Sequence, residues 1–304
     1  MMKRWAAVLG GCLALATVGA AAAGVKIATY NVENYVATNR LTEAGYRKDY
    51  PKAEAAKAAL RTVIRELDAD VLVLQEMGPR PYLDELQRDL ATQGTAYPVA
   101  VLLEAADPDR HLAVLARVQL ARVRPHVDLR FRYFDGTEQV KRGLLEVVLA
   151  SPAGDVTLWA VHLKSRYTDR EDDLLSNRRR AGEAMAIREF IRQQGRDRAG
   201  ERFLILGDFN DGKGSAAVRY LSRRGAQTTA HLLPAADSRG EVWTHFYHQN
   251  DTYTRVDHIL VSPALRPAMR EETARIHDSP AVLEASDHRP VSVMLDCEVT
   301  RLDG

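Results

Sequence analysis

Six short polar motifs in this chain combine residue types that can bind a metal ion, activate water and move protons. Each motif stands where an apolar, strand-like run ends or begins, so a rigid scaffold would display its polar groups at the rim of a sheet. The motif residues singled out here are Asn31, Glu76, His162, Asp208, Asn210, Asp257, Asp287 and His288. A lone residue of these types usually serves a turn or a structural hydrogen bond. Six such motifs in one chain favour a common site.

The chemistry that these residue types suit best is hydrolysis of a phosphate ester. Carboxylate and amide oxygens are hard ligands for Mg²⁺, Mn²⁺ or Ca²⁺, which polarise a phosphoryl oxygen. Imidazoles can stabilise developing charge and transfer protons. Zinc fits less well, because the chain has no His-Glu-x-x-His pattern and no pair of thiolates. His245 and His248 lie three positions apart, and we interpret that spacing as incidental.

Two competing catalytic motifs are weak. Residues 207–214 follow an apolar run and approach a phosphate-binding loop in pattern, but Gly214 stands where Ser or Thr would bind Mg²⁺. Asp208 and Asp211 in that segment would also repel a bound phosphate. A Gly-x-Ser-x-Gly elbow does not occur in the sequence, which argues against a serine hydrolase.

The elements that must position the motifs are short strands rich in Val, Ile and Leu, bounded by polar residues or by Gly and Pro. We predict strands over residues 25–30, 71–75, 112–116, 144–150, 156–163, 202–206, 256–261 and 290–295. Apolar periodicity predicts a helix opened by Pro51 and another over about 177–194 that Gly195 ends. Residues 81–91 and 215–223 are further candidate helices. Because strands and helices do not alternate strictly, the pattern indicates packed sheets with helices outside them.

The overall composition limits the classes of protein to which this chain can belong. Of the 304 residues, 46% are hydrophobic and 27% are charged, and the formal net charge of +1 gives no global positive field that would indicate nucleic acid. We expect residues 1–23 to be a signal peptide, removed when the protein becomes periplasmic or secreted. A single domain over 24–304, with Cys297 as its only cysteine, would remain. An uncleaved anchor and a lipoprotein attached through Cys12 are the alternatives.

In order and spacing, the six motifs resemble those of the endonuclease/exonuclease/phosphatase superfamily. That group includes deoxyribonuclease I, abasic-site endonucleases, sphingomyelinases and inositol polyphosphate phosphatases. The resemblance covers about residues 25–295. It implies an α/β (α+β) fold, a deoxyribonuclease I-like, four-layered α/β/β/α sandwich with the site at one sheet edge. It also implies a divalent-metal-dependent hydrolase of phosphoric ester bonds.

The resemblance assigns the metal ligands. Glu76 looks like the principal ligand, with Asn31 and Asp287 on or near an ion of the Mg²⁺ type, for which Mn²⁺ and Ca²⁺ are alternatives. Whether one or two ions act stays open. His258 departs from the family's pattern, because many relatives carry an aromatic residue at this position. We expect that departure to alter the rim of the pocket more than the chemistry.

The resemblance also implies catalytic roles. Asp208 resembles the residue that orients or activates the attacking water, and Asn210 resembles the one that positions water and phosphate. His162 is similar to the histidine that stabilises the pentacovalent phosphoryl group. His288, paired with Asp257, resembles the general acid–base histidine.

The substrate class is less constrained. The inositol phosphatase form of the segment around Asp257 is absent, as is the long, Trp-rich hairpin that bacterial sphingomyelinases use on membranes. The segment after His162 is more similar to that of bacterial secreted nucleases. It contains cations up to and along an expected helix: Lys164, Arg166, Arg170, Arg178, Arg179, Arg180, Arg188 and Arg192. These residues form either a solvated face or contacts to a phosphate backbone.

We therefore expect a phosphodiesterase that cleaves DNA or RNA, with Lys164 and Arg178 as candidate substrate contacts. The alternative is a phosphoesterase that acts on a phospholipid or on a small phosphorylated molecule. Neither interpretation implies an obligate protein partner or a stable membrane anchor. Whether cleavage is internal or from an end is not determined by the sequence.

Overall fold

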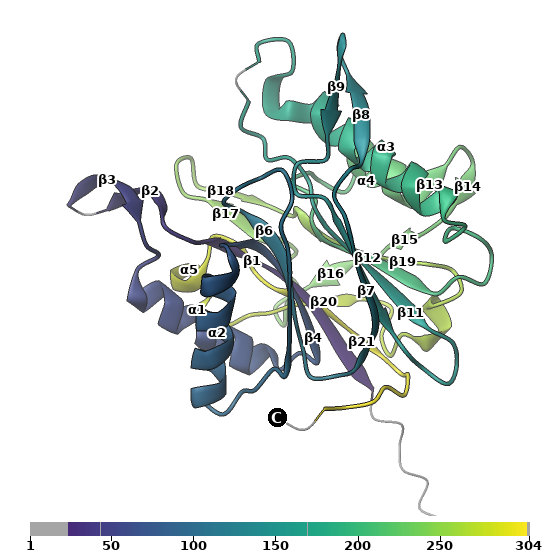
Figure 1. The fold of residues 1–304 in the computed structure, drawn as a ribbon, viewed down its shortest axis with the longest axis horizontal. Coiled ribbons are helices and arrows are strands. Elements are labelled where there is room, and N and C mark those ends of the chain that lie inside the picture. The colour runs from purple at the N-terminus through teal and green to yellow at the C-terminus, as the bar shows by residue number, and fades with distance from the viewer. Residues whose placement is uncertain (1–23, 43, 169, 303–304) are drawn as a thin grey trace, which may run out of the picture.

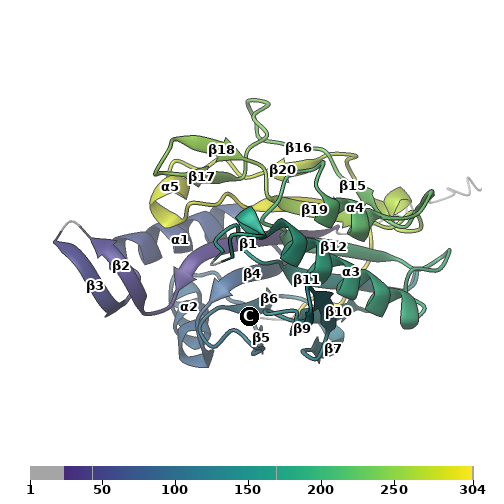
Figure 2. The ribbon, with the colours of Figure 1, turned by 90° about the horizontal axis from the view of Figure 1, so that it is seen from above.

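Two β-sheets packed face to face form the centre of the protein (Figures 1 and 2). The computed structural model describes residues 24–42, 44–168 and 170–302, so the expected signal peptide and Cys12 lie outside the described residues. The first sheet has seven strands, in the order β16 (Ala235–Ala236), β20 (Ala274–Ile276), β21 (Val291–Leu295), β1 (Val25–Tyr35), β4 (Val71–Met77), β6 (His111–Ala116) and β5 (Val99–Leu103). The second has six, in the order β15 (His231–Leu232), β19 (Asp257–Val261), β12 (Phe203–Asp208), β11 (Val156–His162), β10 (Leu144–Leu149) and β7 (Leu120–His126).

The central strands are buried on both faces, which explains why they read as continuous apolar runs. In β1, Val25 and Ile27 pack between the two sheets, whereas Ala28 and Tyr30 pack under the helices. β12 alternates in the same way between the inter-sheet core and the core beneath its own helices. The strand period of two residues therefore divides each sheet's side chains between two apolar cores.

Helices cover the outer faces of both sheets (Figures 1 and 2). The longer helices are α1 (Glu54–Leu67), α2 (Arg80–Thr92), α3 (Asn177–Gln193) and α4 (Ala216–Ser222), and α5 (Val282–Ala285) is a single turn. In both views α1 and α2 lie on one side of the sheets and α3 and α4 on the other. This arrangement confirms the expected four layers. No helix among the described residues is long and apolar enough to cross a bilayer.

All eight predicted strands and all four predicted helices are present, but the first helix does not begin at Pro51. Its first residue is Glu54, because the preceding segment turns Lys52 inward, where its Nζ donates to the backbone and side chain of Glu33 at 3.1 and 3.2 Å. The expected stop of α3 is confirmed, since Gly195 adopts a φ of +68° two residues after the helix ends.

Three hairpins near the ends of strands were not predicted. They are β2–β3 (Thr38–Thr42 and Gly45–Tyr50), β8–β9 (Arg130–Tyr133 and Gly136–Gln139) and β17–β18 (His245–Tyr247 and Thr252–Thr254). In Figure 1 the first projects to the left of the body and the second projects upward. The short pair β13–β14 (Arg223–Arg224 and Gln227–Thr228) and two 3₁₀ turns, Leu174–Ser176 and Arg266–Ala268, complete the chain.

Candidate active site

The six motifs meet at one edge of the sandwich. β1 and β4 run parallel, as do β11 and β12, so each pair ends together. β21 pairs antiparallel with β1 and β19 antiparallel with β12, so both begin where the others end. Asp208 lies opposite His162 in one ladder and opposite Asp257 in the other. A hydrogen bond of 3.0 Å from Asn31 Nδ2 to Asp208 Oδ2 joins the two sheets at this edge.

Asp208 is the centre of a hydrogen-bonded network. Its Oδ1 accepts from the Asn210 backbone at 2.7 Å, and its Oδ2 accepts from the side chains of Asn31 and Asn210, both at 3.0 Å. The His162 Nε2 lies 3.6 Å from the same Oδ2. Burial raises the pKa of Asp208 to about 7, with a nearby Asp257 acting in the same direction and His288 against it. Burial also holds the pKa of His162 well below its ordinary value, so its ring is neutral.

Gly207 allows His162 and Asp208 to lie side by side. Its φ is +146°, and a Cβ at this position would lie 1.9 Å from the carbonyl oxygen of Val161. Only glycine fits such an approach between β11 and β12, which explains its place directly before Asp208.

Gly207→Ala is expected to destabilise the protein by about 3 kcal/mol or more, because the two strands would have to separate. Urea unfolding followed by circular dichroism measures this loss. Gly212→Ala is the matched control, since no heavy atom lies within 4 Å of a Cβ there. Equal stability of the two variants would contradict the packing argument.

Asp257 and His288 form a buried pair on neighbouring strand ends. His288 Nδ1 lies 2.8 Å from Asp257 Oδ2, and Asp257 is fully buried. Thr244 Oγ1 accepts the Asp257 backbone N–H at 3.1 Å, and Ser286 Oγ accepts that of His288 at 3.1 Å. Burial lowers the pKa of His288, but the carboxylates of Asp257 and Asp287 outweigh it and hold that pKa well above its ordinary value. The pair therefore keeps an oriented imidazolium at the edge of the site.

Carboxylates gather at the corner where β1, β4 and β21 meet. Glu76 Oε2 accepts the backbone N–H of Asn34 at 2.9 Å, and Glu76 itself has a φ of +60°. Burial raises the pKa of Glu33, and the charges of Asp287 and Glu76 add to this while Lys52 opposes it. Three carboxylates that affect one another in this way form a negative corner that suits a cation. Because its donors are oxygens, the set that contains Asn31, Glu76 and Asp287 fits an ion of the Mg²⁺ type.

Closer sets of possible ligands involve histidine. The ligand atoms of His245, Asp287 and His288 lie within 4.8 Å of one another, as do those of Asp208, Asp257 and His288. In the part of the chain that the structure describes, Glu76 belongs to neither set. Asp287 therefore lies close to both histidines, at 3.5 Å from His245 and 3.9 Å from His288.

His245 is a site residue that the sequence analysis missed. Its Nε2 lies 3.5 Å from Asp287 Oδ2, and its ring centroid is 4.6 Å from that of His288. The spacing to His248 was indeed incidental, because the His248 ring packs on Phe246 instead. An isolated β-bridge between residues 245 and 288 brings His245 to the site, and this pairing is visible only in the structure.

His258 does not form part of the pocket rim, contrary to expectation. It is fully buried, its Nε2 lies 2.9 Å from the backbone oxygen of Asp211, and its ring meets Phe209 edge to face. Burial lowers its pKa to about 4, so the ring is neutral. His258 therefore fixes the loop after Asp208 from beneath.

A buried ion pair anchors the motif that contains Asp287 and His288. Arg289 is 2% exposed, and its Nη2 donates to Asp237 Oδ2 at 2.7 Å. Asp237 Oδ1 accepts backbone N–H groups of Arg239 and Glu241 at 2.8 and 2.9 Å. Burial raises the pKa of Asp237, but these hydrogen bonds outweigh it and hold that pKa well below its ordinary value.

Asp237→Asn is expected to cost about 3 kcal/mol of unfolding free energy at pH 7, because Arg289 would stay buried without its main partner. A depressed pKa contributes stability above the ordinary pKa of Asp, about 3.9, and loses it as pH falls further. The difference between the two proteins should therefore shrink below about pH 4. Urea unfolding at pH 7 and pH 3 measures it, with the half-buried Asp278, 3.6 Å from Arg289, as the control position for the same change. A pH-independent difference would contradict the assignment.

The cations along α3 are mostly neutralised within the protein. Arg179 pairs with Glu138, Arg192 with Glu189, and the fully buried Arg180 with Asp211 at 3.2 Å. Asp173 caps the helix by accepting the backbone N–H groups of Arg178 and Arg179 at 2.9 and 3.1 Å. Arg179 and Arg180 thus hold the helix to the rest of the domain, and Arg192 is neutralised within the helix, so these three arginines are explained without a ligand.

The two candidate substrate contacts are also engaged. The Arg178 guanidinium lies over the Phe134 ring at 5.0 Å. A further arginine of the helix, Arg188, lies over the Tyr220 ring at 5.4 Å in the same way. Lys164 is 9% exposed, and its Nζ donates to oxygens of Ser165 and Tyr167. Lys164 therefore ties down the loop after His162, and of the two only Arg178 retains a partly accessible cation.

Comparisons with known proteins agree with this geometry. A search of curated proteins found no match. Among solved structures, beta toxin from Staphylococcus aureus is similar at a TM-score of 0.62 and 14% identity, covering 88% of this chain and 99% of the toxin. Sphingomyelinase C from Streptomyces griseocarneus gives 0.60 and 16%, covering 90% and 99%. The 3′ phosphatase NExo from Neisseria, bound to a product DNA hairpin, gives 0.56 and 17%, covering 89% and 99%.

At such identities these likenesses establish the fold. The family is established separately, by sequence. The model of the Endonuclease/Exonuclease/phosphatase family matches residues 28–288, from β1 through the histidine of the last motif. The match therefore includes the whole strand edge at which the six motifs meet. This protein belongs to the endonuclease/exonuclease/phosphatase family.

Proposed function

We propose that this protein is an exported, divalent-metal-dependent phosphodiesterase that cleaves nucleic acid by attack of an activated water. The observation that carries the reaction type is the contact of Asp208, from one sheet, with Asn31, from the other, beside the Asp257–His288 pair. Asn31, Glu76 and Asp287 would hold the ion, for which Mg²⁺ is the first choice. When bound, a divalent ion supplies Lewis acidity to a phosphoryl oxygen.

The chain's own residues then orient water and move protons. Asp208 holds the attacking water through its carboxylate, and Asn210 fixes that carboxylate from two sides. The neutral His162 offers a ring N–H to a phosphoryl oxygen. His288, kept protonated by the carboxylates around it, donates a proton to the leaving oxygen.

Nucleic acid is supported by the side chains exposed around the site. The hairpins β2–β3 and β17–β18 and the loop after β11 expose Tyr46, Tyr167, Tyr247 and Tyr253. Exposed aromatic rings interleaved with cations are the usual platform for stacking bases of a single strand. Arg47 and Lys48 supply such cations on β3, next to Tyr46.

A phospholipid is the second candidate substrate. Leu41, Leu174 and Leu175 are exposed in the same hairpin and loop, at 85%, 70% and 56%. Apolar side chains of this kind could also enter the surface of a bilayer. The interleaved tyrosines and cations lead us to prefer nucleic acid.

Turnover of the protein without residues 1–23 distinguishes the two candidates. The substrates would be single- and double-stranded DNA, RNA, phospholipid vesicles and inositol phosphates, each with Mg²⁺ and with Mn²⁺. We expect nucleic acid to be cleaved in a metal-dependent manner. Hydrolysis of the vesicles alone would replace the proposed substrate by the second candidate, and turnover in excess chelator would overturn the metal mechanism.

A further inference from the structure

A cavity of about 570 Å³ opens beside the catalytic loops, and we call it the corner pocket. Its floor is apolar and includes Leu232, Leu233, Pro234 and Val242. Three cations line the same cavity, namely Arg166, Lys213 and Arg255. The corner pocket therefore combines an apolar floor with positively charged side chains around it.

The cations of the corner pocket come from the same loops and strand ends as the active-site residues. Lys213 follows Asn210 by three residues, and Arg255 precedes Asp257 by two. Arg166 lies in the loop that follows His162. Arg255 Nη2 donates to the backbone oxygen of Leu233 at 2.7 Å, which joins the floor to the strand that carries Asp257.

The cations of the corner pocket form no ion pairs. Among the described residues, Arg166, Lys213 and Arg255 have no carboxylate within ion-pair distance, although the charge of Asp257 acts on Arg255 from farther away. Arg255 Nε is buried and has no hydrogen-bond partner in the described chain. Three cations that line one cavity and form no ion pair within the described part of the protein favour an anionic ligand.

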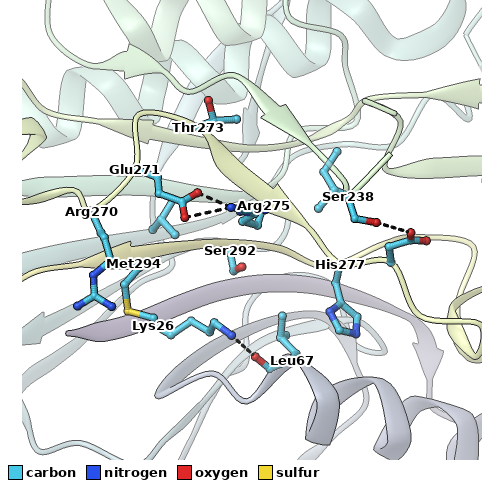
Figure 3. Close-up of a pocket in the computed structure, with 13 residues that line it drawn as sticks. Lys26, Leu67, Ser238, Arg270, Glu271, Thr273, Arg275, His277, Ser292 and Met294 are labelled. Atoms are coloured by element: carbon cyan, nitrogen blue, oxygen red, sulfur yellow. Dashed lines mark hydrogen bonds and ion pairs between the residues drawn. The ribbon is translucent and has the colours of Figure 1, made fainter. Parts of the chain in front are cut away.

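In a second cavity of the same protein most of the charged side chains form ion pairs. This cavity has a volume of about 470 Å³ and lies beside the beginning of β1, among β20 and β21 (Figure 3). There Arg275 pairs with Glu271 at 2.9 Å, as Figure 3 shows, and His277 with Glu66 at 3.4 Å. Arg270 pairs with Asp296 at 2.6 Å. Lys26, whose Nζ donates to the backbone oxygen of Leu67 at 2.8 Å, is a cation of this cavity that forms no ion pair with a described residue, whereas three such cations line the corner pocket.

The corner pocket's lining selects among phosphate esters. A choline-type headgroup is cationic and would be repelled by the three cations. An inositol phosphate carries a hydroxyl or a phosphate group on every ring carbon, so its ring has no flat apolar face and would leave polar groups unpaired against an apolar floor. A nucleotide meets both demands, because its base has flat apolar faces and its phosphate is anionic.

We propose that the corner pocket binds the nucleotide next to the scissile phosphodiester, with the base on the apolar floor and the neighbouring phosphate on Arg166, Lys213 and Arg255. This inference rests on the proposed function and makes it more specific. The corner pocket would recognise a single nucleotide whose base is not paired with another strand. The pocket would then add affinity for nucleic acid without touching the reacting atoms.

The test compares Arg166→Gln/Lys213→Gln with the parent protein on two substrates. Both residues are exposed, so the variant should fold. Its KM for a single-stranded oligonucleotide is expected to rise by about tenfold, because charge-assisted contacts to one phosphate are lost. Its kcat should be unchanged, as should its kinetics on bis(p-nitrophenyl) phosphate, because this substrate has no neighbouring phosphate for Arg166 and Lys213 to bind. The control Arg65→Gln/Arg198→Gln removes two exposed cations elsewhere and should leave the oligonucleotide KM unchanged.

The floor is tested by Val242→Asp, which places a charge on an exposed part of it. We expect weaker binding of AMP, measured by calorimetry with the parent protein as reference. Unchanged oligonucleotide KM in the double variant, an equal rise in the control, or no binding of AMP to the parent protein would overturn the inference. Failure of the proposed function looks different, since the parent protein would then hydrolyse bis(p-nitrophenyl) phosphate or vesicles but no nucleic acid.

Discussion

Glu76→Gln is expected to lower turnover by about 10²-fold or more and to raise the metal concentration needed for half-maximal activity. The negative corner around Glu76 and Asp287 would lose one of its charges, and a divalent ion held by few protein oxygens loses much affinity with each. Glutamine keeps an oxygen that can accept the Asn34 N–H, so the backbone around this position should be preserved. Initial rates on bis(p-nitrophenyl) phosphate across a Mg²⁺ titration measure both effects.

The matched control is Glu284→Gln, an exposed carboxylate on α5, which should leave the metal titration unchanged. Glu33→Gln provides a finer comparison, because the Glu33 charge is already balanced by Lys52 at 3.2 Å. We expect Glu33→Gln to fall between the other two variants. A Glu76→Gln protein with the parent's metal requirement would remove Glu76 from the set of ligands.

The fold could be predicted where a strand's own sequence decides its state. The central strands are buried on both faces, and this requires continuous apolar runs such as 71–75 and 202–206 that are visible without any partner. The hairpin β2–β3 could not be found in this way, because its residues, apart from Gly45, are polar or exposed. Its strands are held by each other and by Arg40, whose guanidinium reaches the backbone oxygens of Asn34 and Val36.

Most of the residues that meet at the candidate site could be predicted from the sequence, but His245 and the pairing of the nearby cations could not. Each motif adjoins a strand end, and the sheet order then brings the motifs together. The partners that neutralise the arginines of α3 are distant in sequence, as with Arg179 and Glu138 or Arg180 and Asp211. A run of cations on one helix therefore suggested a ligand surface, whereas the three cations of the corner pocket, which form no ion pair among the described residues, come from three separate segments.

Asp257→Asn is expected to keep the fold while lowering turnover by about 10²-fold or more. Asparagine can still accept a hydrogen bond from His288 Nδ1, but it removes the charge that stabilises the imidazolium. The backbone of Asp257 stays fixed through Thr244 Oγ1, which does not depend on the carboxylate. The unchanged structure can be checked by circular dichroism and by the urea midpoint.

The double-mutant cycle of Asp257→Asn and His288→Ala shows whether the two residues act as one unit. His288 Nδ1 and Asp257 Oδ2 are 2.8 Å apart in a buried site, so removing either partner should abolish the same contribution. The double variant should then be little slower than either single variant, because residues that act as a unit are not additive. The pair Glu66 and His277, 3.4 Å apart on the surface, is the matched control, and Glu66→Gln with His277→Ala should change turnover little and additively. Strictly additive losses for Asp257 and His288 would mean that the carboxylate serves the fold and the imidazole acts without it.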